Sequence, residues 1–303
     1  MKTLRAYLEL IRLPNAFTAA ADALAGYWLA RGMLVGDRRL AELIVASVCL
    51  YSAGIVLNDL RDVDIDRCER PARPLPSGQV SLTAAVWLMT ALFGVGLLAA
   101  MASGSTRGIV IEVGPANGAL WTAVTLVAAI AMYNLVLKGT PLGPPAMGLC
   151  RALNLALPLA ATRVEITNAH AAALLAVFVY VTALTYFGRD EAGVTSRRRL
   201  ALGGLGVIGG LLILGFVTVW NPSEDSLTLV VWLALAIQTG RAAWRAWKRP
   251  DAVLVRHAMK TFILGIIAFD AVIACAVGGW RAAAVVLALL IPPALIGRRL
   301  YST

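Results

Sequence analysis

NDLRDVDID, residues 58–66, follows an apolar run of about twenty residues and precedes the basic, proline-rich stretch RPARPLPSG, residues 70–78. In an α-helix each residue turns by roughly 100°, so Asn58, Asp62 and Asp66 fall within an arc of about 80°. The spacing therefore predicts a carboxamide and two carboxylates on one helical face at the end of an apolar helix.

Asp59 adds a third carboxylate to this face, about 20° beyond Asp66, whereas Asp64 falls well off it. Like charges this close repel one another unless a cation lies among them. Hard oxygen ligands suit Mg²⁺, which usually takes one or two carboxylates together with substrate phosphate oxygens. The alternative interpretation is a solvated acidic loop that lies beside basic residues.

The composition indicates an integral membrane protein. Apolar residues make up 59% of the 303 positions, only 15% are charged, and the mean hydropathy is +0.77. Soluble domains are nearer 45–50% apolar and about 25% charged. Four scattered cysteines and two histidines give no disulfide framework and no histidine-based metal site. We expect one integral membrane domain over residues 1–303.

Apolar runs of the length that a bilayer core requires recur along the whole chain. We place spans near residues 17–35, 40–58, 81–102, 119–137, 144–161, 169–187, 200–220, 227–246, 261–279 and 282–297. Pro292-Pro293 interrupts the last one, which makes it an addition to nine core spans. The spans are rich in Gly and Ala, which lets helices approach closely. The expected fold is an all-α, polytopic transmembrane helical bundle.

The positive charges predict the orientation. If the N-terminus is cytoplasmic and the loops alternate, 20 of the 27 Lys and Arg residues fall on the cytoplasmic side. This bias predicts a multi-pass protein of the cell membrane, with both termini and residues 58–78 in the cytoplasm. The basic stretch 241–260 reads as a membrane-surface helix on anionic lipid. No nucleic-acid fold can be placed around it, so nucleic acid is not an expected partner.

The acidic stretch resembles a known motif. Asn58-Asp59-x-x-Asp62-x-x-x-Asp66, followed by Arg73-Pro74-Leu75-x-x-Gly78, is similar to the first aspartate-rich motif of the UbiA superfamily of intramembrane prenyltransferases. The resemblance implies a protein that binds a prenyl diphosphate through Mg²⁺ and transfers the prenyl group to an acceptor. It implies metal ligands at Asn58, Asp62 and Asp66, a catalytic role for Asp59, and diphosphate binding by Arg73.

A second motif of the family is incomplete in this chain. Asp190-Glu191 matches its adjacent acidic pair and implies a second set of metal ligands, but Tyr186 stands near the place of the earlier acid. We expect Tyr186 to orient a ligand or to stack against a cation. This departure, with RPARPLPSG (70–78) and MGLCRALN (147–154), is closest to the EboC-like branch of the superfamily. That branch is associated with moving metabolite precursors to the cell envelope.

Other cytoplasmic helix ends supply further candidates. Tyr133 is a candidate catalytic residue, and Lys138 could neutralise a diphosphate or act as an interfacial anchor. The family has a tyrosine and a lysine here, usually one residue closer together. Asn15, in the N-terminal segment, is an expected substrate-binding residue.

Arg151 and Asn154 lie about 60° apart on one face of a span. An arginine within a span is costly unless it is paired or faces a wet cavity. We expect both residues to bind substrate in a cavity. The alternative for Arg151 is a structural salt bridge to Asp22 or Asp270. The sequence therefore predicts a Mg²⁺-dependent prenyltransferase with an unidentified acceptor; the alternative is a degenerate relative that transports an isoprenoid or an envelope precursor without the chemistry.

Overall fold

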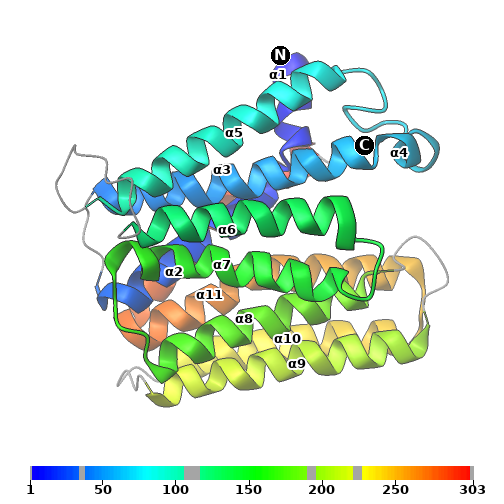
Figure 1. Ribbon diagram of the computed structural model, residues 1–303. Helices are drawn as coiled ribbons and strands as arrows, with labels where there is room; N and C mark the ends of the chain where they lie inside the picture. The colour runs from blue at the N-terminus through cyan, green and yellow to red at the C-terminus, as the bar shows by residue number, and fades with distance from the viewer. Residues whose placement is uncertain (1, 34–37, 106–116, 190–195, 221–226, 301–303) are drawn as a thin grey trace.

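The computed structural model describes residues 2–33, 38–105, 117–189, 196–220 and 227–300, and the regular structure of these residues is helical (Figure 1). The elements are α1 (Lys2–Leu10), α2 (Leu13–Arg31), α3 (Arg38–Arg61), α4 (Val63–Glu69), α5 (Leu82–Ser103), α6 (Gly118–Met132), the π-helix η1 (Tyr133–Leu137), α7 (Gly143–Thr162), α8 (Asn168–Phe187), α9 (Arg197–Trp220), α10 (Leu227–Lys248), α11 (Ala252–Ala288) and α12 (Ile291–Leu300). The predicted all-α membrane bundle is confirmed.

The long helices coincide with the expected spans. In the described part of the chain, seven helices are long and apolar enough to cross a membrane: α3, α5, α6 with η1, α8, α9, α10 and α11. The expected spans near 17–35 and 144–161 correspond to α2 and α7. These two helices bury polar side chains such as Asp22 and Arg151 inside the bundle. The exact number of spans stays a prediction.

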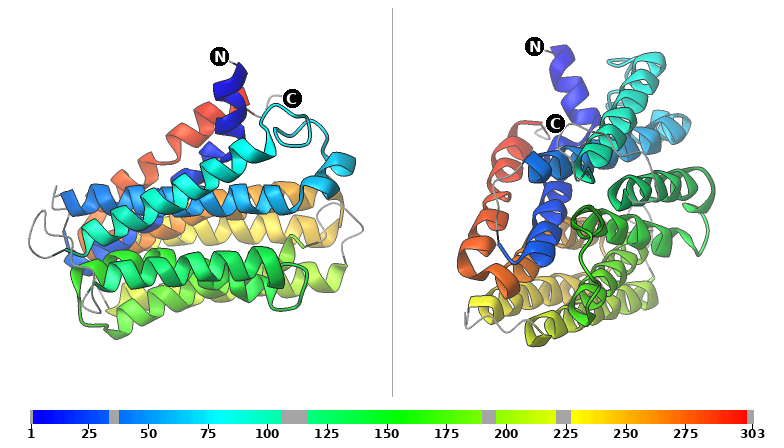
Figure 2. Two further views of the ribbon diagram at one scale, coloured as in Figure 1. Left: turned by 45° about the horizontal axis from the view of Figure 1, so that its top comes forward. Right: turned by 60° about the vertical axis from the view of Figure 1, so that its left-hand side comes forward.

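Most of the long helices pack against their neighbours in chain order. Figure 1 shows α6, α7, α8, α9 and α10 side by side, each in contact with the next, while α2 packs against α3, α7 and α11 (Figure 2). Glycines allow the close approaches. A Cβ at Gly26 would lie 2.5 Å from the Leu155 carbonyl oxygen of α7, and one at Gly148 would lie 2.3 Å from Thr182 Oγ1 of α8. Small residues therefore seat α7 tightly between α2 and α8.

The C-terminal part breaks at the place that the sequence predicted, between the expected spans 261–279 and 282–297. α11 continues through residues 261–279 to Ala288, with a break at Gly279, where φ is 69° and ψ is −168°. Glycine adopts this conformation without a Cβ clash. Pro292 and Pro293 lie in the first turn of α12, where a missing backbone N–H breaks no helical hydrogen bond. The apolar run 282–297 is thus interrupted near the prolines, as predicted, because α11 ends at Ala288 and α12 begins at Ile291.

The sequence suggested a membrane-surface helix over the basic stretch 241–260. The structure instead divides this stretch between two long helices. Its first part is the last turns of α10, which ends at Lys248, and its second part is the first turns of α11, which begins at Ala252. Asp251 caps α11 by accepting a hydrogen bond from the Val253 N–H at 2.6 Å. The amphipathic pattern of these residues arises because each helix end has one face packed inside the bundle.

Candidate functional site

The acidic stretch crosses the junction between α3 and α4. α3 ends at Arg61, Asp62 has φ −90° and ψ 1°, and α4 begins at Val63. The backbone hydrogen bonds nevertheless keep the helical spacing, since Asp62 N–H donates to Asn58 O at 3.0 Å and Asp66 N–H donates to Asp62 O at 2.8 Å. The predicted spacing of Asn58, Asp62 and Asp66 is thus retained across a kink.

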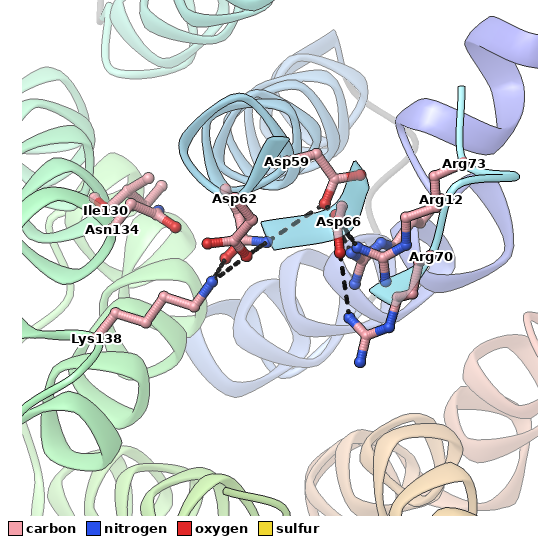
Figure 3. A network of polar contacts seen from close by, with 10 residues as sticks. Arg12, Asp59, Asp62, Asp66, Arg70, Arg73, Ile130, Asn134 and Lys138 are labelled. Carbon is pink, nitrogen blue, oxygen red and sulfur yellow. Dashed lines mark hydrogen bonds and ion pairs between the residues drawn. The ribbon is translucent and has the colours of Figure 1, made fainter. Parts of the chain in front are cut away.

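One part of the acidic cluster holds a lysine. Lys138 Nζ donates to Asn58 Oδ1 at 2.7 Å and forms an ion pair with Asp62 (Figure 3). Asn58 Nδ2 in turn donates to Asp62 Oδ2 at 3.2 Å. The ammonium group therefore lies where oxygen atoms from two successive helical turns converge. Lys138 belongs to this cluster and is more than an anchor at the membrane boundary.

A second part of the cluster holds arginines. Asp59 Oδ1 accepts from Arg12 Nη2 at 2.8 Å, and Asp66 Oδ2 accepts from Arg73 Nη1 at 2.6 Å, with Arg70 3.6 Å from the other Asp66 oxygen (Figure 3). Asp59 and Asp66 are both buried. The carboxylates predicted on one face thus take partners from two directions, Lys138 on one side and the arginines on the other. Asp64 is exposed and pairs with Arg67, which confirms that it lies off the face.

Arg12 is a site residue that sequence reasoning missed. Its backbone is left-handed, with φ 48° and ψ 53°, at the junction between α1 and α2. Non-glycine residues in this region are strained, and such strain often occurs at functional sites. The sequence signal was Pro14, which is favoured in the first turn of a helix and so predicts a helix start next to Arg12. The turn directs the Arg12 guanidinium toward the end of α3.

The unusual spacing between Tyr133 and Lys138 has a structural explanation. Residues 133–137 form the π-helix η1, and Lys138 N–H donates to Tyr133 O at 2.8 Å across five residues. A π-turn accommodates one extra residue within an α-helix, and such turns are frequent at functional sites. The inserted residue therefore leaves both Tyr133 and Lys138 at the site.

A cavity of about 280 Å³ extends from this cluster into the bundle. Its polar lining consists of Arg12, Asn15, Thr18, Tyr51, Asn58, Tyr133, Asn134, Arg151, Asn154 and Thr185. Its apolar lining includes Leu126, Ile130, Ile263 and Ile266. The structure thus brings together Asn15, Asn58, Tyr133, Arg151 and Asn154, which the sequence had predicted as site residues.

Arg151 combines the two roles that the sequence left open. Its guanidinium lines the cavity 5.9 Å from the Tyr51 ring centre, and its Nε lies 2.7 Å from Asp22 Oδ2. Its Nη2 also donates to the Thr18 carbonyl oxygen at 2.6 Å. Asn154 Nδ2 donates to Asp22 Oδ2 at 2.6 Å. Arg151 is therefore part of a buried ion pair in the cavity wall.

Of the second predicted motif, the structure describes Tyr186. Tyr186 is not among the described residues that line the cavity, and the Arg199 guanidinium lies 5.8 Å from the centre of its ring. The geometry thus directs Tyr186 toward α9. Asp190 and Glu191 lie outside the described residues, so their predicted role as metal ligands stays a prediction.

The residues present fit a divalent cation whose coordination shell is completed by oxygen atoms of the substrate. In the described ranges, no group of three His, Cys, Asp or Glu side chains could hold a metal by itself. Mg²⁺ rarely uses an all-protein cage, and it usually combines one or two carboxylates with substrate phosphates. The oxygens around the Lys138 ammonium already bind a positive group. Asn58 and Asp62 therefore have suitable chemistry, with Asp66 one helical turn away.

Comparison with known proteins gives consistent results. A sequence model described as the UbiA prenyltransferase family matches residues 19–266. Digeranylgeranylglyceryl phosphate synthase of Methanoculleus marisnigri is 36% identical over 136 residues, which is 45% of this chain and 44% of that protein. The corresponding enzyme of Methanocaldococcus jannaschii is 38% identical over 100 residues, 32% of this chain and 35% of that protein. The chain thus spans less than half the length of these curated relatives.

Solved structures share the fold. A digeranylgeranylglyceryl phosphate synthase structure superposes with a TM-score of 0.65 at 20% identity, covering 91% of this chain and 99% of the other. A UbiA homologue from Archaeoglobus fulgidus bound to GPP and Mg²⁺ superposes with a TM-score of 0.59 at 14% identity, covering 89% and 99%. The closer resemblance to the EboC-like branch stays a prediction. With a family match over most of its length, a shared helical fold and the acidic cluster in place, the chain belongs to the UbiA prenyltransferase family.

Proposed function

We propose that this protein is a Mg²⁺-dependent prenyltransferase that binds a prenyl diphosphate at the acidic cluster and transfers the prenyl group to an acceptor in the cavity. The observation that carries the proposal is that Lys138 contacts both Asn58 and Asp62 beside a cavity that extends into the apolar bundle. Two features of the relatives support it. They are named synthases of a prenylated lipid, and the Archaeoglobus homologues contain GPP or DMAPP with Mg²⁺.

The residues would share the work as follows. Asn58, Asp62 and Asp66 would hold Mg²⁺, with Asp190 and Glu191 as further candidates. When bound, the metal supplies charge stabilisation for the departing diphosphate. The cationic side chains of Arg12, Arg73 and Lys138 lie at the same end of the cavity and offset the remaining negative charge.

Transfer requires a defined exchange of bonds. The bond between prenyl C1 and the diphosphate oxygen breaks, and its electron pair leaves with the diphosphate. A nucleophilic atom of the acceptor forms the new bond to C1, and the proton it loses passes to the diphosphate or to water. Tyr51 and Tyr133 line the cavity, and their aromatic rings would stabilise positive charge that develops on the allylic carbon.

A pair of matched variants tests the proposal. Asp62→Asn keeps the shape of the side chain but removes charge at the Lys138 position, whereas Asp64→Asn changes an exposed carboxylate off the site. We expect Asp62→Asn to abolish Mg²⁺-dependent binding of geranylgeranyl diphosphate and to reduce turnover by orders of magnitude, since each 1.4 kcal/mol is about tenfold. Asp64→Asn should behave as wild type. If wild type shows no Mg²⁺-dependent binding and Asp62→Asn does not differ from it, the proposal is wrong.

A second candidate function is an isoprenoid carrier that lacks the transfer chemistry. The observation that favours it is Tyr186, which stands in place of an acid and contacts Arg199 rather than the cavity. Diphosphate release separates the two candidates. Mg²⁺-dependent binding without release, across a broad panel of acceptors, would identify the carrier.

A further inference from the structure

A second cavity lies apart from the acidic cluster. It measures about 350 Å³ and lies between α10 and α11, two helices that pack against each other. Its walls include Ala234, Ile237, Gln238, Arg241 and Arg245 of α10 and His257 of α11. None of these residues lines the cavity beside the acidic cluster, although α11 contributes other side chains to that cavity. The two cavities are therefore separate.

Two arginines give this second cavity its positive charge. Arg241 and Arg245 are four residues apart, so their side chains lie on the same face of α10. In the described part of the chain, neither guanidinium forms an ion pair or a side-chain hydrogen bond. Arg12, Arg73 and Arg151, by contrast, all pair with carboxylates. The charge of the cavity between α10 and α11 is thus not compensated by a carboxylate of the described chain.

The surroundings of this cavity carry almost no negative charge. Residues 238–261 contain one acid, Asp251, and six basic residues: Arg241, Arg245, Lys248, Arg249, Arg256 and Lys260. The Asp251 side chain caps α11 by accepting from the Val253 N–H at 2.6 Å. Gln238 and His257 add side-chain donors that form no hydrogen bond with other described residues. Two guanidinium groups with further donors suit the oxygens of a phosphate group.

The cavity changes from apolar to cationic along α10. Ala234 and Ile237 form its apolar end, and Arg241 lies one turn closer to the end of the helix, roughly 6 Å along the axis from Ile237. α10 ends at Lys248, so both arginines lie in its last turns, while the apolar residues lie nearer the middle of this membrane helix. A soluble phosphate would match the cationic end alone. A phospholipid matches both ends, because its acyl chain can follow the apolar part while its phosphate reaches the arginines.

This end of α10 lies on the same side of the bundle as the acidic cluster. Next to Lys138 of that cluster, the Gly139 carbonyl oxygen accepts from Arg189 Nη2 at 2.5 Å. A Cβ at the neighbouring Gly188 would lie 2.6 Å from the sulfur of Met259, in the first turns of α11. The predicted orientation places this side in the cytoplasm, where the membrane leaflet carries anionic lipids.

We propose that the cavity between α10 and α11 binds one anionic phospholipid, with its phosphate between Arg241 and Arg245 and an acyl chain along Ile237 and Ala234. Basic pockets between membrane helices on the cytoplasmic side bind such head groups. Phosphatidylcholine fits less well, because its choline group brings a positive charge to the same arginines. The inference does not depend on the proposed function, since it uses none of the residues of the prenyl diphosphate site.

Two lipids that differ only in their head groups test the inference. Purified protein in dodecyl maltoside is titrated with dioleoylphosphatidylglycerol or with dioleoylphosphatidylcholine, and native mass spectrometry measures the affinity for the first bound lipid. We expect phosphatidylglycerol to bind at least about fivefold more tightly than phosphatidylcholine, because each arginine near the phosphate favours the anionic lipid. Equal affinities, or tighter binding of phosphatidylcholine, would overturn the inference.

Matched pairs of substitutions locate the lipid. Arg241→Gln with Arg245→Gln removes two charges from the cavity, whereas Lys248→Gln with Arg249→Gln removes two charges at the same helix end from residues that do not line it. We expect the first pair to weaken phosphatidylglycerol binding at least about fivefold and the second pair to change it less than about twofold. Equal weakening by both pairs would indicate a diffuse basic surface. That result, or no weakening by the first pair, would contradict the assigned site.

The apolar end has its own matched pair. Ile237 lines the cavity and is 50% exposed, whereas Leu233, one turn away, is 42% exposed and does not line it. Ile237→Ser should weaken phosphatidylglycerol binding about threefold, because less apolar surface contacts the acyl chain. Leu233→Ser should leave the affinity unchanged. The same affinity in both variants would overturn the placement of the acyl chain.

Soluble phosphates distinguish the two sources of the phosphate group. Inorganic phosphate and glycerol 3-phosphate, added at millimolar concentration, should not displace bound phosphatidylglycerol. Displacement by either would assign the cavity to a soluble phosphate and overturn the assignment to a lipid. If the arginine variant fails to fold, wild type with a phosphatidylglycerol that carries a diazirine in its acyl chain provides the test. Its cross-links should map within residues 234–261, and cross-links confined to other helices would refute the inference.

Discussion

Two arginine–aspartate pairs in this protein have the same separation and opposite environments. Arg151 Nε lies 2.7 Å from Asp22, with 8% and 0% of the side chains exposed. Arg67 Nη1 also lies 2.7 Å from Asp64, with 54% and 84% exposed. Because distance and chemistry match, the two pairs isolate the effect of burial on the cost of losing an ion pair.

Arg151→Leu should destabilise the bundle strongly. Removing one partner of a buried pair leaves a charge without compensation and typically costs about 3–5 kcal/mol. The variant also loses the hydrogen bond from Arg151 to the Thr18 carbonyl. Arg67→Leu removes an exposed pair, which is worth about 0–1 kcal/mol. We therefore expect a difference of roughly 3 kcal/mol between the variants in the free energy of unfolding.

Adding Asp22→Asn to Arg151→Leu should recover part of the loss, because the double variant no longer contains the uncompensated carboxylate. Reversible unfolding in mixed micelles with increasing SDS, followed by the fluorescence of the eight tryptophans, measures all four proteins. Equal losses for Arg151→Leu and Arg67→Leu would refute the argument. A double variant as unstable as Arg151→Leu alone would show that charge compensation is not what the pair provides.

Other substitutions test the site and the topology. Lys138→Met removes a charged hydrogen-bond donor worth about 1.5–3 kcal/mol, so calorimetry should show roughly tenfold or greater weakening of prenyl diphosphate binding. Lys138→Arg should lie closer to wild type. Unchanged affinity in Lys138→Met would show that Lys138 does not contribute to diphosphate binding. Deleting Val136, an exposed residue of the π-turn, should shift the thermal unfolding temperature little, because the turn can become α-helical. Deleting Val124 in α6 rotates the rest of that helix by about 100° and should lower the unfolding temperature markedly. Equal changes in unfolding temperature for the two deletions would argue against an extra residue accommodated by the π-turn. In a cysteine-free background, an impermeant maleimide should label Met33→Cys on intact cells but not Ser77→Cys, and the reverse pattern would invert the proposed orientation.

The sequence determined the features that depend on local periodicity and composition. Apolar runs located the long helices because a bilayer requires about twenty apolar residues for each crossing. The spacing of Asn58, Asp62 and Asp66 followed from the helical repeat and survived the kink at Asp62. The same repeat correctly left Asp64 outside the cluster, and it placed Arg151 and Asn154 together on one face of α7.

The tertiary structure decided which side chains meet across helices. Arg12 with Asp59, Lys138 with Asp62, and Arg151 with Asp22 join positions far apart in the chain. Helical periodicity fixes the face on which a residue lies but not the rotation, depth and tilt at which two helices pack, so the sequence could name Asp22 and Asp270 as alternative partners of Arg151 without choosing between them. The tertiary structure also decided the π-turn at Tyr133–Leu137. An extra residue can either be accommodated within the helix or rotate the face of every helical residue after it, and packing against the neighbouring helices selects the outcome.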